Sequence, residues 1–181
     1  MSYFVTGATG FIGRFLVKRL MDKNETIYVM ARKSSIGKID ALKTRYEDKK
    51  NLIVPVVGDL SKPGLGISEQ DTKMLKGKVK HFFHVAAIYD LTIPYDEQIQ
   101  ANVEGTRHAL EFAKAINAGI FHHTSSIAAA GFYEGEFHED MYDEAGDLNN
   151  PYFISKHLLP GLASLRILRL FVHLVGQNYL E

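Results

Sequence analysis

The chain has 181 residues, of which 46% are hydrophobic, and its 21 basic and 21 acidic residues give a formal net charge of zero. That length suits one globular domain with a sizeable core, and the balanced charge argues against a nucleic-acid partner, which normally requires a basic excess. The absence of cysteine excludes disulfides, zinc–thiolate sites and thiol nucleophiles, and it fits a reducing cytosol. We expect neither a signal peptide nor an integral membrane segment. We therefore expect a cytoplasmic protein.

Short apolar runs and segments of helical spacing alternate along the chain. We expect strands at residues 3–5, 26–31, 52–57, 81–85 and 120–124. Helices are expected at residues 11–20, 36–46, 71–75 and 98–116, and around Tyr152. Pro55 places the strand 52–57 at a sheet edge or at a strand start, because proline cannot donate to a ladder. Ile39 and Leu42 are expected on the inner face of the helix 36–46. The inner face of the helix 98–116 is expected to carry Val103, Leu110 and Ala113.

This order of elements predicts the fold class. Strands that alternate with helices require parallel strands joined by right-handed crossovers, and short continuous apolar strands indicate a sheet covered on both faces. We therefore expect an α/β fold, a Rossmann-type doubly wound parallel sheet with helices on both faces. The acidic segment 134–150 is interpreted as a loop over the carboxyl end of the sheet, where such folds bind ligands.

A glycine-rich turn follows the first strand directly. Gly7, Gly10 and Gly13 have the spacing G-x-x-G-x-x-G between an apolar strand and an amphipathic helix. Glycines at this place allow a tight turn, a close approach of backbone N–H groups to a pyrophosphate, and tight packing of the helix on the sheet. The candidate cofactor-binding residues of the turn are Gly7, Thr9, Gly10, Phe11, Ile12 and Gly13.

The end of the second strand bears on the choice of cofactor. NAD enzymes usually carry an acidic residue there to bind the ribose 2′-hydroxyl, but this sequence has Arg32, followed by Lys33 and Ser34. A guanidinium can form charge-assisted bonds to the 2′-phosphate of NADP. We therefore predict NADP(H) as the cofactor, with Arg32 and Ser34 as candidate ligands; a solvated basic loop is the alternative.

Tyr152 and Lys156 are four residues apart, which places both side chains on one face of a helix. A lysine ammonium near a phenol favours the phenolate and lowers the tyrosine pKa, so Tyr152 could exchange a proton with a carbonyl oxygen during hydride transfer. Ser125 and Ser126, at the end of the fifth strand, could hydrogen-bond the same oxygen. A Y-x-x-x-K pair alone is common, but its position after the glycine turn and the serines makes it specific.

Taken together, these motifs resemble those of the extended short-chain dehydrogenases/reductases. The resemblance covers residues 1 to about 157, and its motifs stand in family order: Thr6–Gly13, Gly58-Asp59-Leu60, His84-Val85-Ala86-Ala87, Asn102–Thr106, Thr124-Ser125-Ser126, and Tyr152 with Lys156.

The resemblance implies a role for each matching position. Gly7, Gly10 and Gly13 match the pyrophosphate turn, Asp59 and Leu60 the pair beside the adenine, and Ala86 and Ala87 the strand end beside the cofactor ribose. Asn102 matches a helix residue that supports the active-site strand. Ser126 is the implied catalytic serine, because Gly131 follows it by five residues. Tyr152 matches the acid/base, and Lys156 matches the residue that lowers its pKa and holds the nicotinamide ribose. The candidate catalytic residues are therefore Ser126, Tyr152, Lys156 and Asn102.

Within that superfamily, four segments are similar to the N-terminal reductase region of bacterial fatty acyl-CoA reductases, which reduce acyl thioesters with NADPH. They are Tyr3–Thr6, His81–Asp90, Asn102–Ala109 and His122–Gly131. The implied function is NADPH-dependent reduction of a carbonyl, either a fatty acyl thioester or an aldehyde. Two alternatives remain: a nucleotide-sugar epimerase or dehydratase, and a non-catalytic NADP-binding module.

The resemblance ends after Lys156. Pro160-Gly161 is expected to interrupt the helix within about one turn, 165–169 resembles the next strand, and Leu170-Phe171 stands where the family has Pro-Gly. We therefore interpret residues 1–181 as a single NADP-binding Rossmann domain whose C-terminal substrate-binding region is missing or truncated after about residue 157. The expected partner is a small-molecule substrate, with acyl-CoA as one candidate. A homodimer through the helix 98–116 and the helix near Tyr152 is a candidate assembly, and no metal site is expected.

Overall fold

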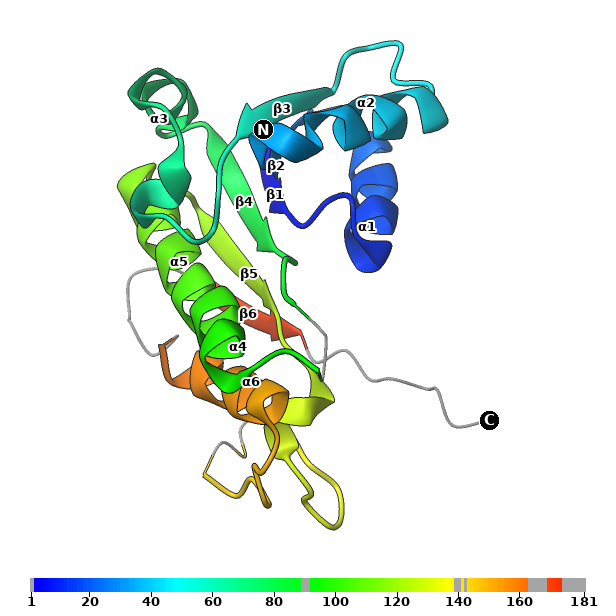
Figure 1. Ribbon diagram of the computed structural model, residues 1–181. Helices are drawn as coiled ribbons and strands as arrows, with labels where there is room; N and C mark the ends of the chain where they lie inside the picture. The colour runs from blue at the N-terminus through cyan, green and yellow to red at the C-terminus, as the bar shows by residue number, and fades with distance from the viewer. Residues whose placement is uncertain (1, 89–91, 139–140, 142, 163–168, 174–181) are drawn as a thin grey trace.

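The computed structural model describes residues 2–88, 92–138, 141, 143–162 and 169–173. Within these residues six parallel strands form one sheet in the order β3-β2-β1-β4-β5-β6 (Figure 1). The strands are β1 (Ser2–Thr6), β2 (Thr26–Ala31), β3 (Ile53–Val57), β4 (Val79–His84), β5 (Ile120–Thr124) and β6 (Arg169–His173). The predicted Rossmann-type parallel sheet is confirmed. Pro55 lies in the edge strand β3, where its missing N–H costs no ladder hydrogen bond.

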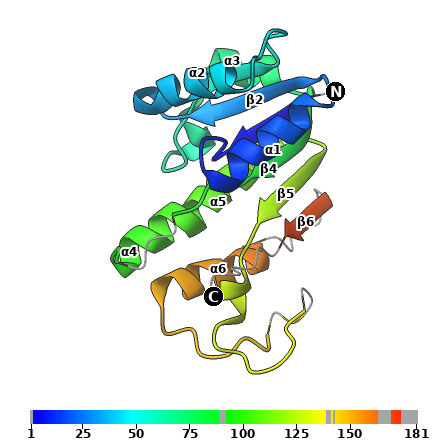
Figure 2. The same cartoon turned by 90° about the vertical axis from the view of Figure 1, so that its right-hand side faces the viewer.

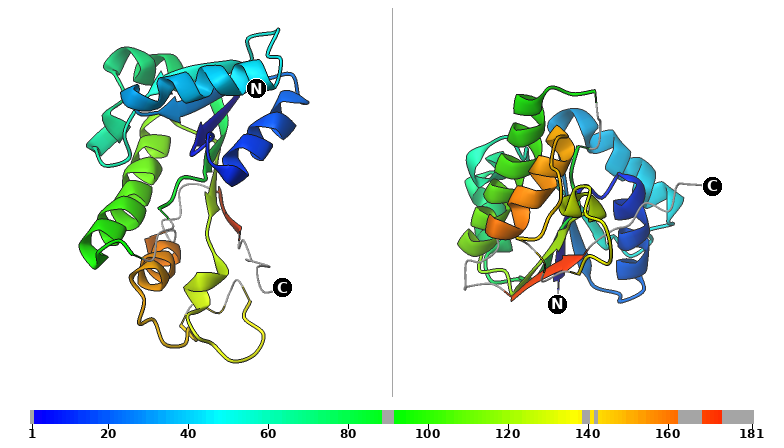
Figure 3. Two further views of the ribbon diagram at one scale, coloured as in Figure 1. Left: turned by 45° about the vertical axis from the view of Figure 1, so that its right-hand side comes forward. Right: turned by 90° about the horizontal axis from the view of Figure 1, so that it is seen from below.

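Helices cover both faces of the sheet (Figure 3). On one face lie α1 (Phe11–Met21) and α2 (Ile36–Arg45). On the other lie α3 (Glu69–Leu75), α5 (Gly105–Ala115) and α6 (Pro151–Leu162), preceded by the short α4 (Tyr95–Gln98). The remaining helical segments are the 3-10 turns η1 (Lys33–Ser35), η2 (Pro63–Gly66) and η4 (Ile127–Ala130), and the π-helical segment η3 (Ile99–Glu104). No helix among the described residues is long and apolar enough to cross a membrane.

The two faces of the sheet carry separate hydrophobic cores because successive side chains of a strand point to opposite faces. Phe4, Phe82 and Phe121 stack across β1, β4 and β5, with ring centroids 4.7 and 5.2 Å apart, beneath α3 and α5. Side chains of the intervening positions pack under α1 and α2, where Ile39 and Leu42 are buried as predicted. Each core holds its helices against the strands whose carboxyl ends form the site described below.

The predicted long helix 98–116 differs from the observed one in its first turns. The segments α4, η3 and α5 form one continuous rod (Figure 2), and Leu110 and Ala113 are buried as expected. However, Asn102 is buried in place of Val103, which is half-buried. The wider π-helical turn changes which side chains face inward.

The C-terminal elements also differ from expectation. Helix α6 continues through Pro160 and Gly161 to Leu162, because a proline near a helix end removes few of its hydrogen bonds. The sixth strand comprises Arg169–His173, so Leu170 and Phe171 lie inside a strand. Residues 165–168 of the predicted strand lie outside the described part of the chain.

The β1–α1 turn is tightly packed. Gly7 has a φ of +71°, and a Cβ added to it would lie 2.6 Å from the Ala86 backbone nitrogen. A Cβ on Gly13 would lie 2.7 Å from Ala8 Cα and still closer to the Gly7 carbonyl oxygen. All these neighbours are backbone atoms, so only glycine fits at either position.

Replacing Gly13 by alanine should therefore lower the free energy of unfolding by about 1–3 kcal/mol, because the turn must open to admit a methyl group. The matched control is Gly37→Ala on α2, where an added Cβ meets nothing within 4 Å. This control should stabilise the protein by about 0.5–1 kcal/mol. Urea unfolding measures both changes, and equal stability of the two variants would contradict the tight packing of α1 on the turn.

Candidate active site

The candidate site lies at the carboxyl ends of β1 and β4, where the strand order reverses direction. From β1 the sheet grows one way through β2 and β3 and the other way through β4, β5 and β6. Open parallel sheets bind ligands in the crevice at such a point. Gly7 follows β1 here, and residues 85–87 follow β4. The backbones of the two loops meet at Gly7 and Ala86.

Two adjoining hollows open at this point and share Gly7, Ala86 and Ala87. The first has a volume of about 430 Å³. It brings together the glycine turn, the serine pair and the Tyr–Lys pair, which lie far apart in the sequence. Its lining residues are Gly7, Gly10, Phe11, Ile12, Gly13, Val85, Ala86, Ala87, Thr124, Ser125, Ser126, Tyr152 and Lys156.

The second hollow, of about 390 Å³, continues from the first towards the ends of β2 and β3. Asp59 lies in it, and hydrogen bonds from the backbone N–H and hydroxyl of Ser61 keep the pKa of this carboxyl below its usual value. The other residues that line the second hollow are Gly7, Thr9, Met30, Ala31, Arg32, Ser35, Lys38, Gly58, Leu60, Ser61, Ala86, Ala87, Ile88 and Ala101.

The basic corner of the second hollow differs in part from the sequence prediction. Arg32 lines it as predicted, but Ser34 does not; Ser35 and Lys38 do. The 3-10 turn η1 connects β2 to α2, and Lys38 follows Ser35 by three residues, which places both on one helix face. The three-residue spacing of Ser35 and Lys38 after Arg32 could have predicted from the sequence that both residues line this corner.

Tyr152 and Lys156 extend from α6 into the first hollow, and both are buried. The Lys156 Nζ lies 5.7 Å from the centroid of the Tyr152 ring. Asn150 caps the start of α6, since its side-chain oxygen accepts a hydrogen bond of 2.8 Å from the Tyr152 N–H. The four-residue spacing therefore brings the ammonium and the phenol together, as predicted.

Burial also changes the charge properties of Lys156. Its side chain is only 3% exposed, and desolvation lowers its pKa from 10.5 to about 8. Proteins rarely bury an ammonium group without a functional reason, because the charged form is strongly destabilised away from water. Lys156 therefore remains a cation at neutral pH but can release its proton at mildly alkaline pH.

Ser126 follows β5 by two residues and caps the short turn η4. Its Oγ accepts a hydrogen bond of 3.2 Å from the Ala128 N–H at the start of η4, and Ser126 lines the first hollow. Gly131 ends η4 with a φ of +60°, and a side chain there would collide with the Asp147 carbonyl oxygen. The five-residue spacing from Ser126 to Gly131 thus spans one compact turn.

Asn102, grouped by its sequence motif with the candidate catalytic residues, lines neither hollow. Its side chain accepts a hydrogen bond from the Ile88 N–H (2.8 Å) and donates to the Ile88 carbonyl oxygen (3.0 Å) and to Ser155 Oγ (3.1 Å). Asn102 therefore ties the loop after β4 to helix α6. Its place is that of a positioning residue, which agrees with the supporting role that the resemblance implies.

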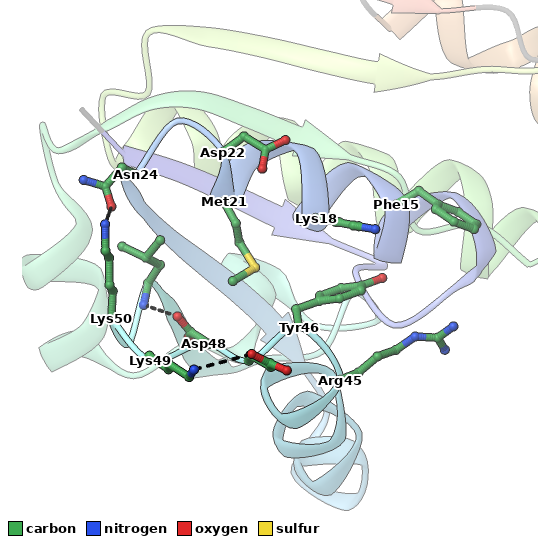
Figure 4. Close-up of a pocket in the computed structure, with 12 residues that line it drawn as sticks. Phe15, Lys18, Met21, Asp22, Asn24, Arg45, Tyr46, Asp48, Lys49 and Lys50 are labelled. Carbon is green, nitrogen blue, oxygen red and sulfur yellow. Dashed lines mark hydrogen bonds and ion pairs between the residues drawn. The ribbon is translucent and has the colours of Figure 1, made fainter.

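A larger hollow, of about 670 Å³, lies away from these motifs between α1, α2 and the segment before β3 (Figure 4). It contains none of the predicted site residues. Its polar groups serve the fold: the Tyr46 hydroxyl donates to the Arg14 carbonyl oxygen, and the Asp48 carboxylate accepts from the N–H groups of Leu52 and Ile53. We therefore place the functional site at the first two hollows.

Comparison with known proteins identifies relatives. Residues 5–163 match the family model described as Male sterility protein, an NAD-binding family. A linear gramicidin synthase of Brevibacillus parabrevis is 30% identical over 175 residues, covering 89% of this chain and 3% of the relative. Fatty acyl-CoA reductase 1 of Homo sapiens is 28% identical over 142 residues, covering 69% of this chain and 28% of the relative.

A solved structure is also similar to this chain. The crystal structure of the terminal R domain from the myxalamid PKS-NRPS biosynthetic pathway matches with a TM-score of 0.82 and 25% identity, covering 97% of this chain and 48% of that chain. This chain thus spans less than half the length of these curated and solved relatives.

The burial of Lys156 predicts how the stability of the protein depends on pH. The folded-state pKa lies near 8 and the unfolded-state pKa near 10.5. Between these values the unfolded state binds more protons, so the free energy of unfolding should rise with pH in this window. Below pH 8 the full desolvation cost is present, about 3 kcal/mol.

Lys156→Met should therefore stabilise the protein at pH 7, and this gain over wild type should shrink as the pH rises from 8 to 10.5. The exposed Lys80 on β4 provides the control, since Lys80→Met should change stability little at any pH. Urea unfolding at several pH values measures the effect. A gain from Lys156→Met that does not change with pH would show that the lysine charge is not the cause.

Proposed function

We propose, from the premise that this chain belongs to the male sterility protein family of NAD-binding domains, that it binds NADP(H) and reduces the carbonyl of an acyl thioester or aldehyde. The observation that carries this proposal is the lining of the first hollow, where Ser126, Tyr152 and Lys156 face the glycine turn. A proton donor, its cationic neighbour and a second hydroxyl thus lie beside the place where a dinucleotide would bind.

The shape of the site fits a dinucleotide. Gly7 and Gly13 keep side chains out of the turn, and the N-terminus of α1 follows it at Phe11. Backbone N–H groups and the helix dipole at such a place favour a pyrophosphate. The second hollow extends from this point towards Asp59 and Leu60, which would hold the adenosine half. The first hollow would hold the nicotinamide half, beside Tyr152.

The basic corner supports NADP(H) as the cofactor. Arg32, Ser35 and Lys38 line one end of the second hollow. Two cations and a hydroxyl form a suitable set of donors for a 2′-phosphate, because guanidinium and ammonium groups make strong charge-assisted hydrogen bonds to phosphate oxygens. No acidic residue stands at the end of β2, where an NAD enzyme would bind the ribose hydroxyls with a carboxylate.

The protein groups at the first hollow would provide acid–base chemistry. The Ser126 and Tyr152 hydroxyls would hydrogen-bond the substrate carbonyl oxygen, and Tyr152 would donate a proton to it. The Lys156 ammonium, 5.7 Å from the Tyr152 ring, favours the phenolate that remains and would bind the nicotinamide ribose. Asn102 would act indirectly by holding the loop after β4 against α6.

The printed names of two relatives support an acyl substrate in this proposal. One is named a fatty acyl-CoA reductase, and the terminal R domain belongs to a PKS-NRPS pathway. NADPH, when bound, supplies the hydride: an acyl thioester, NADPH and one proton become an aldehyde, a thiol and NADP⁺. The exposed Phe11, Ile12 and Phe132 side chains would contact an apolar acyl chain.

The first test concerns the cofactor. Arg32→Ser should weaken NADPH binding about tenfold or more, the loss expected for a hydrogen bond to a charged group, and should leave NADH binding unchanged. Lys33→Ser is the matched control, because Lys33 neighbours Arg32 but lines neither hollow. Fluorescence titration with both nucleotides measures the affinities. Tighter binding of NADH than NADPH by wild type would instead favour the nucleotide-sugar epimerase or dehydratase alternative.

The second test concerns turnover. With NADPH and palmitoyl-CoA, wild type should release free thiol and aldehyde, and Tyr152→Phe should lower the rate by about 10²–10⁴-fold, the usual contribution of a general acid. Tyr95→Phe, at an exposed tyrosine on α4, should leave the rate unchanged. If wild type binds NADPH but no carbonyl compound reacts above background, the chain is a cofactor-binding module without catalysis.

A further inference from the structure

His84 is a fully buried histidine at the end of β4, just before the site. Both of its ring nitrogens are hydrogen-bonded. Nδ1 lies 2.8 Å from the Thr6 hydroxyl on β1, and Nε2 lies 2.9 Å from the Thr106 hydroxyl on α5. One imidazole therefore connects two strands of the sheet to the helix that covers them.

The hydrogen bonds of this connection can be assigned in one direction throughout. The Ala86 N–H donates to Thr6 Oγ1 at 3.4 Å, and in the assignment that we adopt the Thr6 hydroxyl donates to His84 Nδ1. Nδ1 is then an acceptor, and the proton of the neutral ring lies on Nε2, which donates to Thr106 Oγ1. Burial lowers the pKa of His84 to about 3, which agrees with a neutral ring at every pH at which the protein works.

Neighbouring rings fix the orientation of the imidazole. The buried His123 ring stacks on His84 with centroids 5.6 Å apart and an interplanar angle of 21°, and Phe121 lies 6.0 Å away. Burial keeps the His84 ring neutral first of all, and the Lys156 cation lowers its pKa further; burial also lowers the pKa of His123. The stacked rings thus hold the imidazole plane in one orientation.

This hydrogen-bonded chain ends at the close approach of the loops that follow β1 and β4. The Ala86 nitrogen that donates to Thr6 is also the atom that a Cβ on Gly7 would meet most closely, at 2.6 Å. Gly7 and Ala86 also line both hollows. A change in the Thr6–His84–Thr106 chain would therefore change the spacing of the two loops between which a dinucleotide would bind.

We propose that His84 is a positioning residue for the cofactor: through Thr6 and Thr106 it holds the ends of β1 and β4 and helix α5 at the spacing that the dinucleotide requires. This inference rests on the proposed NADP(H) site, because it concerns the geometry of that site. His84 lines neither hollow, so it acts through the backbone of Gly7 and Ala86.

The test compares NADPH affinity in a set of linked variants. His84→Phe keeps a ring of similar size but removes both hydrogen bonds, and Thr106→Val removes only the partner on α5. Each should raise the NADPH dissociation constant about three- to tenfold in protein that circular dichroism shows to be folded. The double variant should bind no more weakly than His84→Phe, because both changes break the same chain. Thr106→Ser keeps the hydroxyl and should restore wild-type affinity.

Nitrogen-15 NMR of the histidine rings gives a second readout that needs no cofactor. Wild-type His84 should show a protonated Nε2 and an unprotonated Nδ1, and Thr106→Val should change this signal. Unchanged NADPH affinity in His84→Phe and Thr106→Val, whatever their thermal stability, would overturn the inference and leave the cofactor site intact. If His84→Phe does not fold, the comparison of NADPH affinity between Thr106→Val and Thr106→Ser decides whether the inference holds. A wild type that binds no NADPH would refute the proposed function and this inference together.

Discussion

The whole site depends on the approach of three backbone segments to one another at the β1–α1 turn. Side chains normally separate packed backbones, but Gly7 and Gly13 leave no room for a Cβ against Ala86, Ala8 and the turn itself. This contact brings the N-terminus of α1 to the strand ends, and it also sets the distance between the loops that follow β1 and β4. Both hollows meet at this contact, so the geometry of either one depends on it.

Around this contact, buried polar groups replace ordinary core residues. The sheet face under α5 is apolar at Phe4, Phe82 and Phe121, yet towards the carboxyl end the same face carries Thr6, His84 and His123. Buried polar groups cost stability unless they are hydrogen-bonded, and Thr6 and His84 are bonded to one another. The transition from an apolar to a polar interior thus coincides with the transition from a supporting core to a site, as expected where function sets the residue type.

The sequence predicted the parts that depend on local chemistry. Pro55 indicated an edge strand because proline lacks a donor, and the spacing of Tyr152 and Lys156 placed both on one helix face; the structure agrees with both. The sequence could not predict features that depend on tertiary packing. The π-helical turn that buries Asn102 in place of Val103 is one such feature. At the basic corner the spacing of Ser35 and Lys38 was a usable signal, but the 3-10 turn that brings Ser35 rather than Ser34 to the hollow was not evident from the sequence.

The two halves of the site are built by different means, and this difference has a consequence for specificity. Around the β1–α1 turn the lining comes from glycines and strand ends, whose close packing tolerates few substitutions. Phe11 and Ile12, in the first turn of α1, line the first hollow with side chains that are 66% and 41% exposed. Exposed apolar side chains beside a hollow mark a surface for another apolar group, and they can change without disturbing the turn. Under the proposed function, a site built this way would keep one cofactor while its substrate preference varied through a few exposed side chains.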